Sequence, residues 1–127
     1  MPKTSQKSKI LVVDDIPQNV RLLEISLKAE GYSVISAYSG QEALDKVRTE
    51  NPDLVLLDIM MPEMDGYETI RRIRQKKEYW NLPIIALTAK VMEMDRNKCI
   101  EAGANDYLPK PVDVDRLISL IRIWLYE

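Results

Sequence analysis

The chain has 127 residues, 46% of them hydrophobic, which is the size and apolar share of a single globular domain with one core. Its formal net charge of -2 gives no reason to expect nucleic-acid binding by the domain as a whole, and no apolar run approaches the roughly 18–20 residues that span a bilayer. The sequence contains no histidine, which excludes Ser-His and Cys-His catalysis, a phosphohistidine carrier and imidazole metal ligands, so any metal would be held by oxygen atoms.

Residues 1–8 are polar and lack the apolar core of a secretory signal, so we expect a short flexible tail on a cytoplasmic protein. The apolar, β-branched run Lys9–Val13 predicts a first strand, which is followed by Asp14 and Asp15. Pro17 suits the first turn of a helix. Apolar side chains then recur at helical spacing, at Val20, Leu23 and Leu27.

A second strand and a second helix follow. Gly31 is placed to end the first helix, and Ser33–Ala37 predicts the next strand. Ser39 and Glu42 have the spacing of a capping box, which predicts a helix start. That helix is expected to end at Asn51-Pro52, because the residue before a proline is disfavoured in the helical region.

The stretch Leu54–Asp58 runs four branched apolar residues into one carboxylate, the pattern of a strand buried on both faces of a parallel sheet. Such a strand delivers its last side chain to the carboxyl edge of the sheet, where ligands bind in open α/β folds. Taken alone, Asp58 is either a reactive group or a helix cap. Pro62 then begins a loop, and Asp65 with Glu68 forms a second capping box.

The third helix is expected to point its basic side chains to solvent: Arg71, Arg72, Arg74, Lys76 and Lys77. A loop over residues 79–82 leads to a fourth strand, Ile84–Thr88, and then to a helix from about Val91 to Ala102 that ends at Gly103. That helix contains Cys99, which has no partner for an internal disulfide and fits a reducing compartment.

The short run Asp106–Leu108 predicts a fifth strand, Lys110 follows it, and a last helix covers about Asp113 to Tyr126. Five alternations of strand and helix require parallel pairing through right-handed crossovers. We therefore expect one α/β domain over residues 9–127, with a five-stranded parallel sheet wound on both faces by helices.

Parallel strands end at one edge, so five side chains should converge there: Asp14, Asp15, Asp58, Thr88 and Lys110. Three carboxylates at one place repel one another, and a hard divalent cation such as Mg²⁺ relieves this. A lysine and a hydroxyl beside them would neutralise and hydrogen-bond a phosphoryl group. Because a carboxylate can form an acyl phosphate, the pattern indicates phosphoryl transfer onto Asp58.

Each residue also has a structural interpretation. Asp14 or Asp15 could cap the first helix, Thr88 is a good strand residue, and Lys110 alone would be a solvated surface lysine. The placement of all five at separate strand ends on one edge favours the functional interpretation.

The chain, from about Lys9 to its C-terminus, resembles the receiver domains of two-component response regulators. The resemblance rests on these segments: V-V-D-D at 12–15, S-G-Q-E-A-L at 39–44, L-L-D-I-M-M-P-E-M-D-G at 56–66, A-L-T-A at 86–89 and A-G-A-N-D-Y-L-P-K-P at 102–111. It implies a flavodoxin-like fold with strand order 2-1-3-4-5. It also implies either a stand-alone regulator or a receiver excised from a hybrid sensor kinase.

By this resemblance, Asp58 accepts a phosphoryl group from a histidine kinase or a histidine phosphotransfer protein. Asp14, Asp15, Asp58 and the backbone carbonyl of Met60 hold Mg²⁺, and Lys110 pairs with the phosphoryl group. The family has a cis peptide bond between Lys110 and the following proline. Catalysis is limited to the protein's own phosphorylation and dephosphorylation, so it is not an enzyme in the turnover sense.

The resemblance also implies a conformational switch. Thr88 moves toward the phosphoryl oxygen, and Tyr107 follows inward as its aromatic partner. The surface that changes is the face of the fourth and fifth strands and helices, which would bind a downstream protein rather than nucleic acid or a membrane. Met60 is apolar and large enough to shield an acyl phosphate from water.

Three other interpretations remain at this point. A haloacid-type phosphatase needs a second acid two residues after its nucleophile, where this chain has Met60. A flavin carrier of the same fold needs a phosphate loop after the first strand, where Asp14 and Asp15 would repel phosphate. A degenerate receiver kept only for binding should lack one of the five edge residues.

Overall fold

A parallel five-stranded sheet forms the centre of the molecule, in the strand order β2-β1-β3-β4-β5. The structure is a computed structural model that describes residues 8–89 and 93–126, without the side chains of 93–95. The strands are β1 Lys9–Val13, β2 Ser33–Ala37, β3 Leu54–Asp58, β4 Ile84–Thr88 and β5 Asp106–Pro109. The predicted fold class and strand order are confirmed, and β5 is one residue longer than expected.

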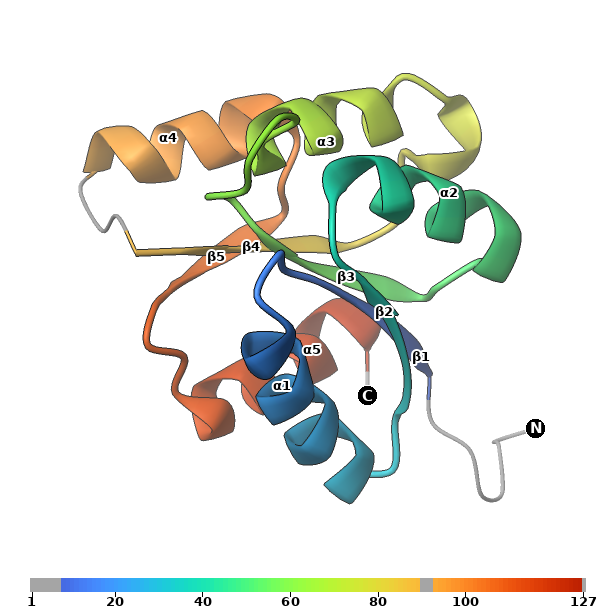
Figure 1. Cartoon of the computed structure of the whole chain (residues 1–127), viewed down its shortest axis with the longest axis vertical. Helices are drawn as coiled ribbons and strands as arrows, with labels where there is room; N and C mark the ends of the chain where they lie inside the picture. The colour runs from blue at the N-terminus through green and yellow to red at the C-terminus, as the bar shows by residue number, and fades with distance from the viewer. Residues whose placement is uncertain (1–7, 90–92, 127) are drawn as a thin grey trace.

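Helices cover both faces of this sheet (Figure 1). They are α1 Pro17–Ala29, α2 Gly40–Glu50, α3 Gly66–Arg74, α4 Glu93–Ala102 and α5 Val114–Leu125. A short 3-10 helix, η1 Lys77–Tyr79, lies in the segment before β4. Helices α1 and α5 lie on one face, and α2, α3 and α4 lie on the other (Figure 1).

The alternation of side chains along the buried strands produces these two layers. Leu11 and Val55 point into the core under α2, α3 and α4, whereas Ile10 and Leu54 point into the core under α1 and α5. Every residue of β3 and β4 is buried. Because both faces are covered, these strands are apolar up to their last residues, Asp58 and Thr88, rather than alternating with polar residues.

The predicted capping signals operate as expected. The Ser39 hydroxyl accepts a hydrogen bond from the Glu42 N–H (3.1 Å), and the Asp65 carboxylate accepts one from the Glu68 N–H (2.9 Å). Gly31 follows α1 with a φ of 95°, in the left-handed region that glycine adopts without strain. Local chemistry therefore fixes where these helices begin and end.

Two expectations were wrong. Arg74 is half-buried, because its guanidinium contacts the turn before β5 instead of solvent. Neither aspartate after β1 caps α1: the N-cap residue is Ile16, which has no side-chain cap, and the backbone N–H that donates to Asp14 is that of Ile16 itself (3.0 Å).

Some expectations concern residues outside the described part of the chain. The predicted start of the fourth helix near Val91 is one of them, and the described helix begins at Glu93. Within the described residues, every helix is too short or too polar to cross a membrane.

Candidate phosphoacceptor site

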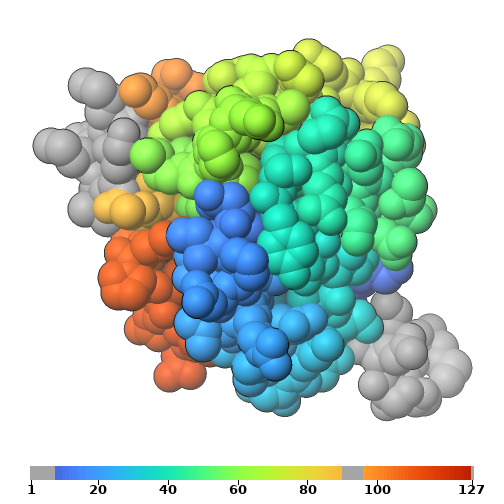
Figure 2. All heavy atoms as spheres, in the orientation of Figure 1, coloured from blue at the N-terminus to red at the C-terminus, as the bar shows by residue number. Residues whose placement is uncertain are grey.

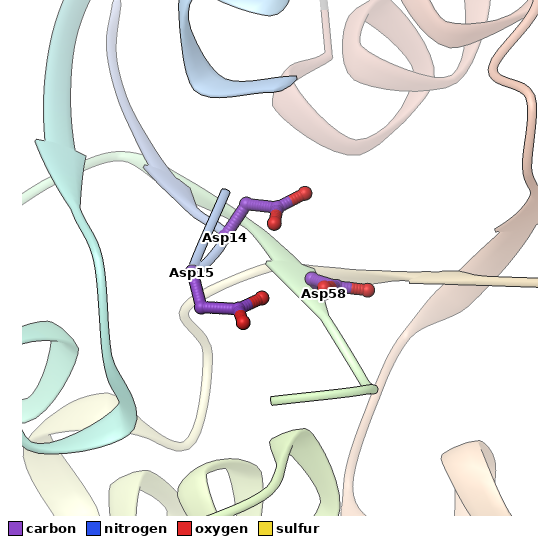
Figure 3. Close-up of side chains that lie close together, drawn as sticks. All are labelled: Asp14, Asp15 and Asp58. Carbon is purple, nitrogen blue, oxygen red and sulfur yellow. The ribbon is translucent and has the colours of Figure 1, made fainter. Parts of the chain in front are cut away.

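Three carboxylates lie together at the carboxyl edge of the sheet (Figure 3). Asp58 is the last residue of β3, and Asp14 and Asp15 follow β1 directly. Strands β1 and β3 are neighbours in register, with Val13 opposite Leu57. One carboxylate oxygen from each aspartate therefore lies within 4.8 Å of those of the other two. The structure brings together the acidic residues that the sequence placed at strand ends.

Lys110 completes this cluster from β5, on the other side of β4. Its Nζ lies 3.0 Å from Asp58 Oδ1 and 3.2 Å from Asp14 Oδ2. The Lys110-Pro111 peptide bond is cis, as the family resemblance implied. The lysine head is largely enclosed, since about a quarter of its side chain is exposed. It is therefore a partner of the buried acids and not a solvated surface lysine.

The Asp58 carboxylate is in an unfavourable setting for its charge. Burial raises its pKa above the ordinary value of 3.8, the nearby Asp14 charge raises it further, and the hydrogen bond from Lys110 acts in the opposite direction. For Lys110, burial by itself lowers the pKa, but the hydrogen bond and charge of Asp58 outweigh burial and the net shift is upward. The buried acids thus favour the ammonium form of Lys110.

Asp58 does not cap a helix. The one backbone N–H that donates to its side chain within the described residues is that of Met60, at a long 3.4 Å from Oδ1. Helix α3 begins eight residues later, with Asp65 as its N-cap. Of the two interpretations of Asp58 that the sequence left open, the helix cap is therefore excluded.

Thr88 and Tyr107 lie beside the cluster on β4 and β5. Thr88 is fully buried at the end of β4, and its carbonyl accepts a hydrogen bond from the Lys110 N–H (2.8 Å). Tyr107 is half-buried, packs against the core under α4, and has the Arg96 guanidinium 5.8 Å from its ring centroid. Thr88 therefore lies at the carboxyl end of β4, and Tyr107 lies on the neighbouring strand β5, opposite Ala86.

The loop after Asp58 depends on a residue that the sequence analysis did not single out. A Cβ on Gly66 would lie 2.6 Å from the Ile59 Cα and 2.7 Å from the Asp58 carbonyl oxygen. The Gly66 N–H also donates to the Ile59 carbonyl (2.9 Å), which folds the loop back on β3. The sequence offers one signal for this close approach: Gly66 stands in the first turn of a helix, where a side chain would ordinarily be tolerated. Met60, in this loop, has its side chain 56% exposed.

The donor set fits a hard divalent cation. Carboxylate oxygens from Asp14, Asp15 and Asp58 are the ligands that Mg²⁺ prefers, with water and carbonyl oxygen filling the other positions. Two of the three acids are buried, so their mutual repulsion is only partly screened by water. A bound cation would remove that repulsion.

An apolar groove opens beside the cluster. It lies between α1 and the segment after β5, has a volume of about 590 Å³, and includes Asp14 and Lys110 in its wall. Leu22, Val112 and Val114 supply its apolar lining. The charged site therefore borders a largely apolar groove.

The fold and the site define a small α/β protein with an oxygen-donor acidic centre at the sheet edge. A family model for the response regulator receiver domain matches residues 10–122. The chain belongs to this family and is a receiver domain of two-component signalling.

Several solved structures are similar to this chain over nearly its whole length. The receiver domain of a sensor histidine kinase from Pseudomonas aeruginosa PAO1, solved with a magnesium ion coordinated in its active site cleft, is 36% identical, with a TM-score of 0.87 and coverage of 94% of this chain and 98% of that chain. The signal receiver domain of a histidine kinase from Syntrophus aciditrophicus is 32% identical, with a TM-score of 0.87 and coverage of 94% and 91%. The chemotaxis protein CheY4 from Vibrio cholerae is 30% identical, with a TM-score of 0.88 and coverage of 93% and 98%.

Proposed function

We propose that Asp58 accepts a phosphoryl group from the phosphohistidine of a histidine kinase or histidine phosphotransfer protein. A carboxylate oxygen of Asp58 attacks phosphorus, the P–N bond to the donor imidazole breaks, and an acyl phosphate forms. The observation that carries this proposal is the placement of Lys110 Nζ 3.0 Å from Asp58 Oδ1, inside a cluster of acids. A buried, ion-paired carboxylate at a strand end is held in position for attack.

Asp14, Asp15 and Asp58 would hold Mg²⁺ together with the backbone carbonyl of Met60. When bound, the cation neutralises charge on the phosphoryl oxygens and on the attacking carboxylate. Lys110 is already ion-paired to Asp58. Its ammonium can therefore form an ion pair with a phosphoryl oxygen on Asp58 with little movement. The exposed thioether of Met60 limits the approach of water to the acyl phosphate.

Phosphorylation would act on the protein through Thr88 and Tyr107. It replaces about one negative charge by about two and adds strong acceptor oxygens. The Thr88 hydroxyl donates to one of these oxygens, and Tyr107 moves inward beside it. The face of β4, α4, β5 and α5 then changes its affinity for a downstream protein, through a shift between two existing conformations.

The protein in this proposal is a cytoplasmic signalling switch and not a turnover enzyme. Its catalysis is confined to gaining and losing one phosphoryl group on Asp58. The proposed receiver unit covers residues 9–127. The acid two residues after the nucleophile that a haloacid-type phosphatase needs is replaced by Met60, which weighs against that alternative.

Intact-mass analysis tests the proposal. Wild-type protein with acetyl phosphate and Mg²⁺ should gain the mass of one phosphoryl group, which is stable in acid and labile in base. Asp58→Asn should gain none, and beryllofluoride should bind only the wild type. Equal modification of Asp58→Asn, or an unmodified wild type, would show that the phosphoacceptor assignment is wrong, and flavin absorbance in the purified protein would favour the flavin-carrier alternative.

A further inference from the structure

Arg74, at the end of α3, anchors the segment that contains η1. Its Nη1 donates to the carbonyls of Tyr79 (2.6 Å) and Leu82 (2.7 Å), and its Nε donates to the Gly103 carbonyl (2.9 Å). Its Nη2 donates to Asn105 Oδ1 (2.8 Å). Hydrogen bonds at these distances, made by one half-buried guanidinium, hold the backbone around η1 in one conformation.

Trp80 extends from this anchored segment into solvent. Its indole N–H donates to the Arg74 carbonyl at 2.9 Å, yet the residue is 57% exposed. The Lys77 ammonium lies 5.8 Å from the ring centroid, within range of a cation–π contact. A large aromatic side chain that is both exposed and fixed loses little conformational entropy on binding, which is the property of an interface anchor.

Positive charge surrounds this indole although the whole chain carries a net charge of -2. Lys76 and Lys77 are exposed, and neither forms an ion pair with any residue in the described ranges. Arg72 forms an ion pair with Glu68. Hydrogen bonds from Arg72 and Arg71 lower the pKa of the Glu68 carboxyl group. Unlike Arg71 and Arg72, the two lysines are therefore free of ion pairs among the described residues and available to an external anion.

A groove between α2 and α3 adjoins these lysines. It has a volume of about 250 Å³ and an apolar lining of Leu44, Val47, Ile73 and Tyr79, with Arg48, Arg72 and Lys76 also in its wall. In Figure 2, α2 in green and the end of α3 with η1 in yellow-green to yellow lie side by side on the surface. The wall of the groove therefore combines apolar residues, which suit an apolar side chain, with cations, which suit acidic residues on either side of it.

We propose that this surface binds an acidic peptide segment of a partner protein. The α3–η1 surface is defined by Arg48, Arg72, Lys76, Lys77 and Trp80. Carboxylates of the partner pair with the cations, one apolar side chain enters the groove, and another packs on the Trp80 ring. Segment η1 leads into the start of β4, at the opposite end of the strands from Asp58, so this surface is separate from the phosphoacceptor site and does not depend on the proposed function.

An acidic peptide fits this surface better than other anions do. Glu68 and Glu78 lie among the cations and would repel a continuous phosphate backbone, which requires an uninterrupted basic path. A membrane surface cannot enter a groove between two helices. Discrete carboxylates with apolar neighbours are complementary to the separate cations and to the apolar residues of the groove.

Fluorescence anisotropy of a labelled peptide tests the proposal. The probe carries two leucines among glutamates, and the matched control peptide has lysines in place of the glutamates. Wild-type protein should bind the acidic peptide saturably and with an affinity that falls as salt rises, and should not bind the basic one. Trp80→Ala, and separately the double variant Lys76→Glu with Lys77→Glu, should each weaken binding about tenfold or more.

Lys28→Glu serves as the matched charge reversal, because Lys28 is an exposed lysine on α1, on the other face of the sheet. It should bind the peptide with nearly wild-type affinity, and circular dichroism melts should show that all variants fold. Absence of binding, equal binding of the two peptides, or full affinity in Trp80→Ala would overturn the proposal. Preferential binding of single-stranded DNA or of anionic lipid vesicles would overturn it as well.

Discussion

At Asp58, the folded protein holds a carboxylate where its charge is disfavoured. The residue is 2% exposed and lies within 4.8 Å of two other acids, and Lys110, with a long hydrogen bond from the Met60 N–H, offsets only part of the loss of hydration. A raised pKa in the folded state means that ionised Asp58 costs stability. The cost is fully present above the raised folded pKa, diminishes as the pH falls toward the unfolded pKa, and is absent below both.

Asp58→Asn should therefore stabilise the magnesium-free protein at neutral pH. The amide removes the unfavourable charge and leaves Lys110 paired with Asp14 at 3.2 Å. The gain should be about 1 kcal/mol, which corresponds to a rise in Tm of a few degrees. Thermal melts measured across the acidic range should show the difference shrinking as pH falls. Glu101→Gln, at an exposed carboxylate on α4, is the control and should change Tm little.

Gly66→Ala should disturb the site without touching any charged group. The added Cβ would meet backbone atoms of Ile59 and Asp58 at 2.6 and 2.7 Å, so the loop or the start of α3 must shift. We expect a loss of about 1–3 kcal/mol in the free energy of unfolding, and slower phosphorylation of Asp58 by acetyl phosphate. Gln41→Ala, in the first turn of α2, is exposed and should leave both quantities unchanged. Unaltered stability in Gly66→Ala would contradict the close approach.

At the scale of elements, Arg74 ties α3 to η1 and to the α4–β5 turn. Helical periodicity could not predict this, because the residue stands in a run of basic side chains. Two of its hydrogen-bond partners, Gly103 and Asn105, belong to a turn 29 and 31 positions away. The same bonds fix the start of β4, since Asn105 Oδ1 also accepts from the Ile84 N–H at 2.8 Å. Arg74 thus links α3, the segment around η1 and the α4–β5 turn, which are separate segments in the sequence.

Arg74→Lys and Arg71→Lys form a matched pair on one helix. Lysine cannot reproduce the forked contacts of Arg74 and would leave buried carbonyls without donors. We expect Arg74→Lys to lose about 2–3 kcal/mol of unfolding free energy, as measured by urea denaturation. Arg71→Lys is exposed and should stay within about 0.5 kcal/mol of the wild type. Similar values for the two variants would mean that the Arg74 contacts contribute little.

Much of the fold followed from local signals. Apolar runs located the strands, capping boxes located the starts of α2 and α3, and strand ends identified the acidic cluster, because parallel strands must end at one edge. The strand order came from family resemblance, since periodicity does not say which strands are neighbours. The sequence could not predict the ion pairs of Lys110 or the close approach of Gly66 to β3. Both depend on how the loops after different strands pack against one another in the fold.

For the molecule as a whole, Mg²⁺ should raise the thermal stability. A ligand that binds only the folded state stabilises it by about 2.7 kcal/mol at a hundredfold excess over its Kd. The wild type should therefore melt several degrees higher with magnesium chloride than with sodium chloride of equal ionic strength. Asp14→Asn should lose most of this increment. An identical increment in Asp14→Asn would place the cation elsewhere.

The contact between Lys110 and Asp14 joins residues 96 positions apart in the chain. A ribosome must therefore have synthesised nearly the whole domain before the two can meet. A nascent or proteolysed chain that ends before β5 would contain Asp58 without its ammonium partner. The Asp58–Lys110 ion pair is thus a property of the finished fold. Under the proposed function, phosphorylation of Asp58 would therefore also report that the domain is complete.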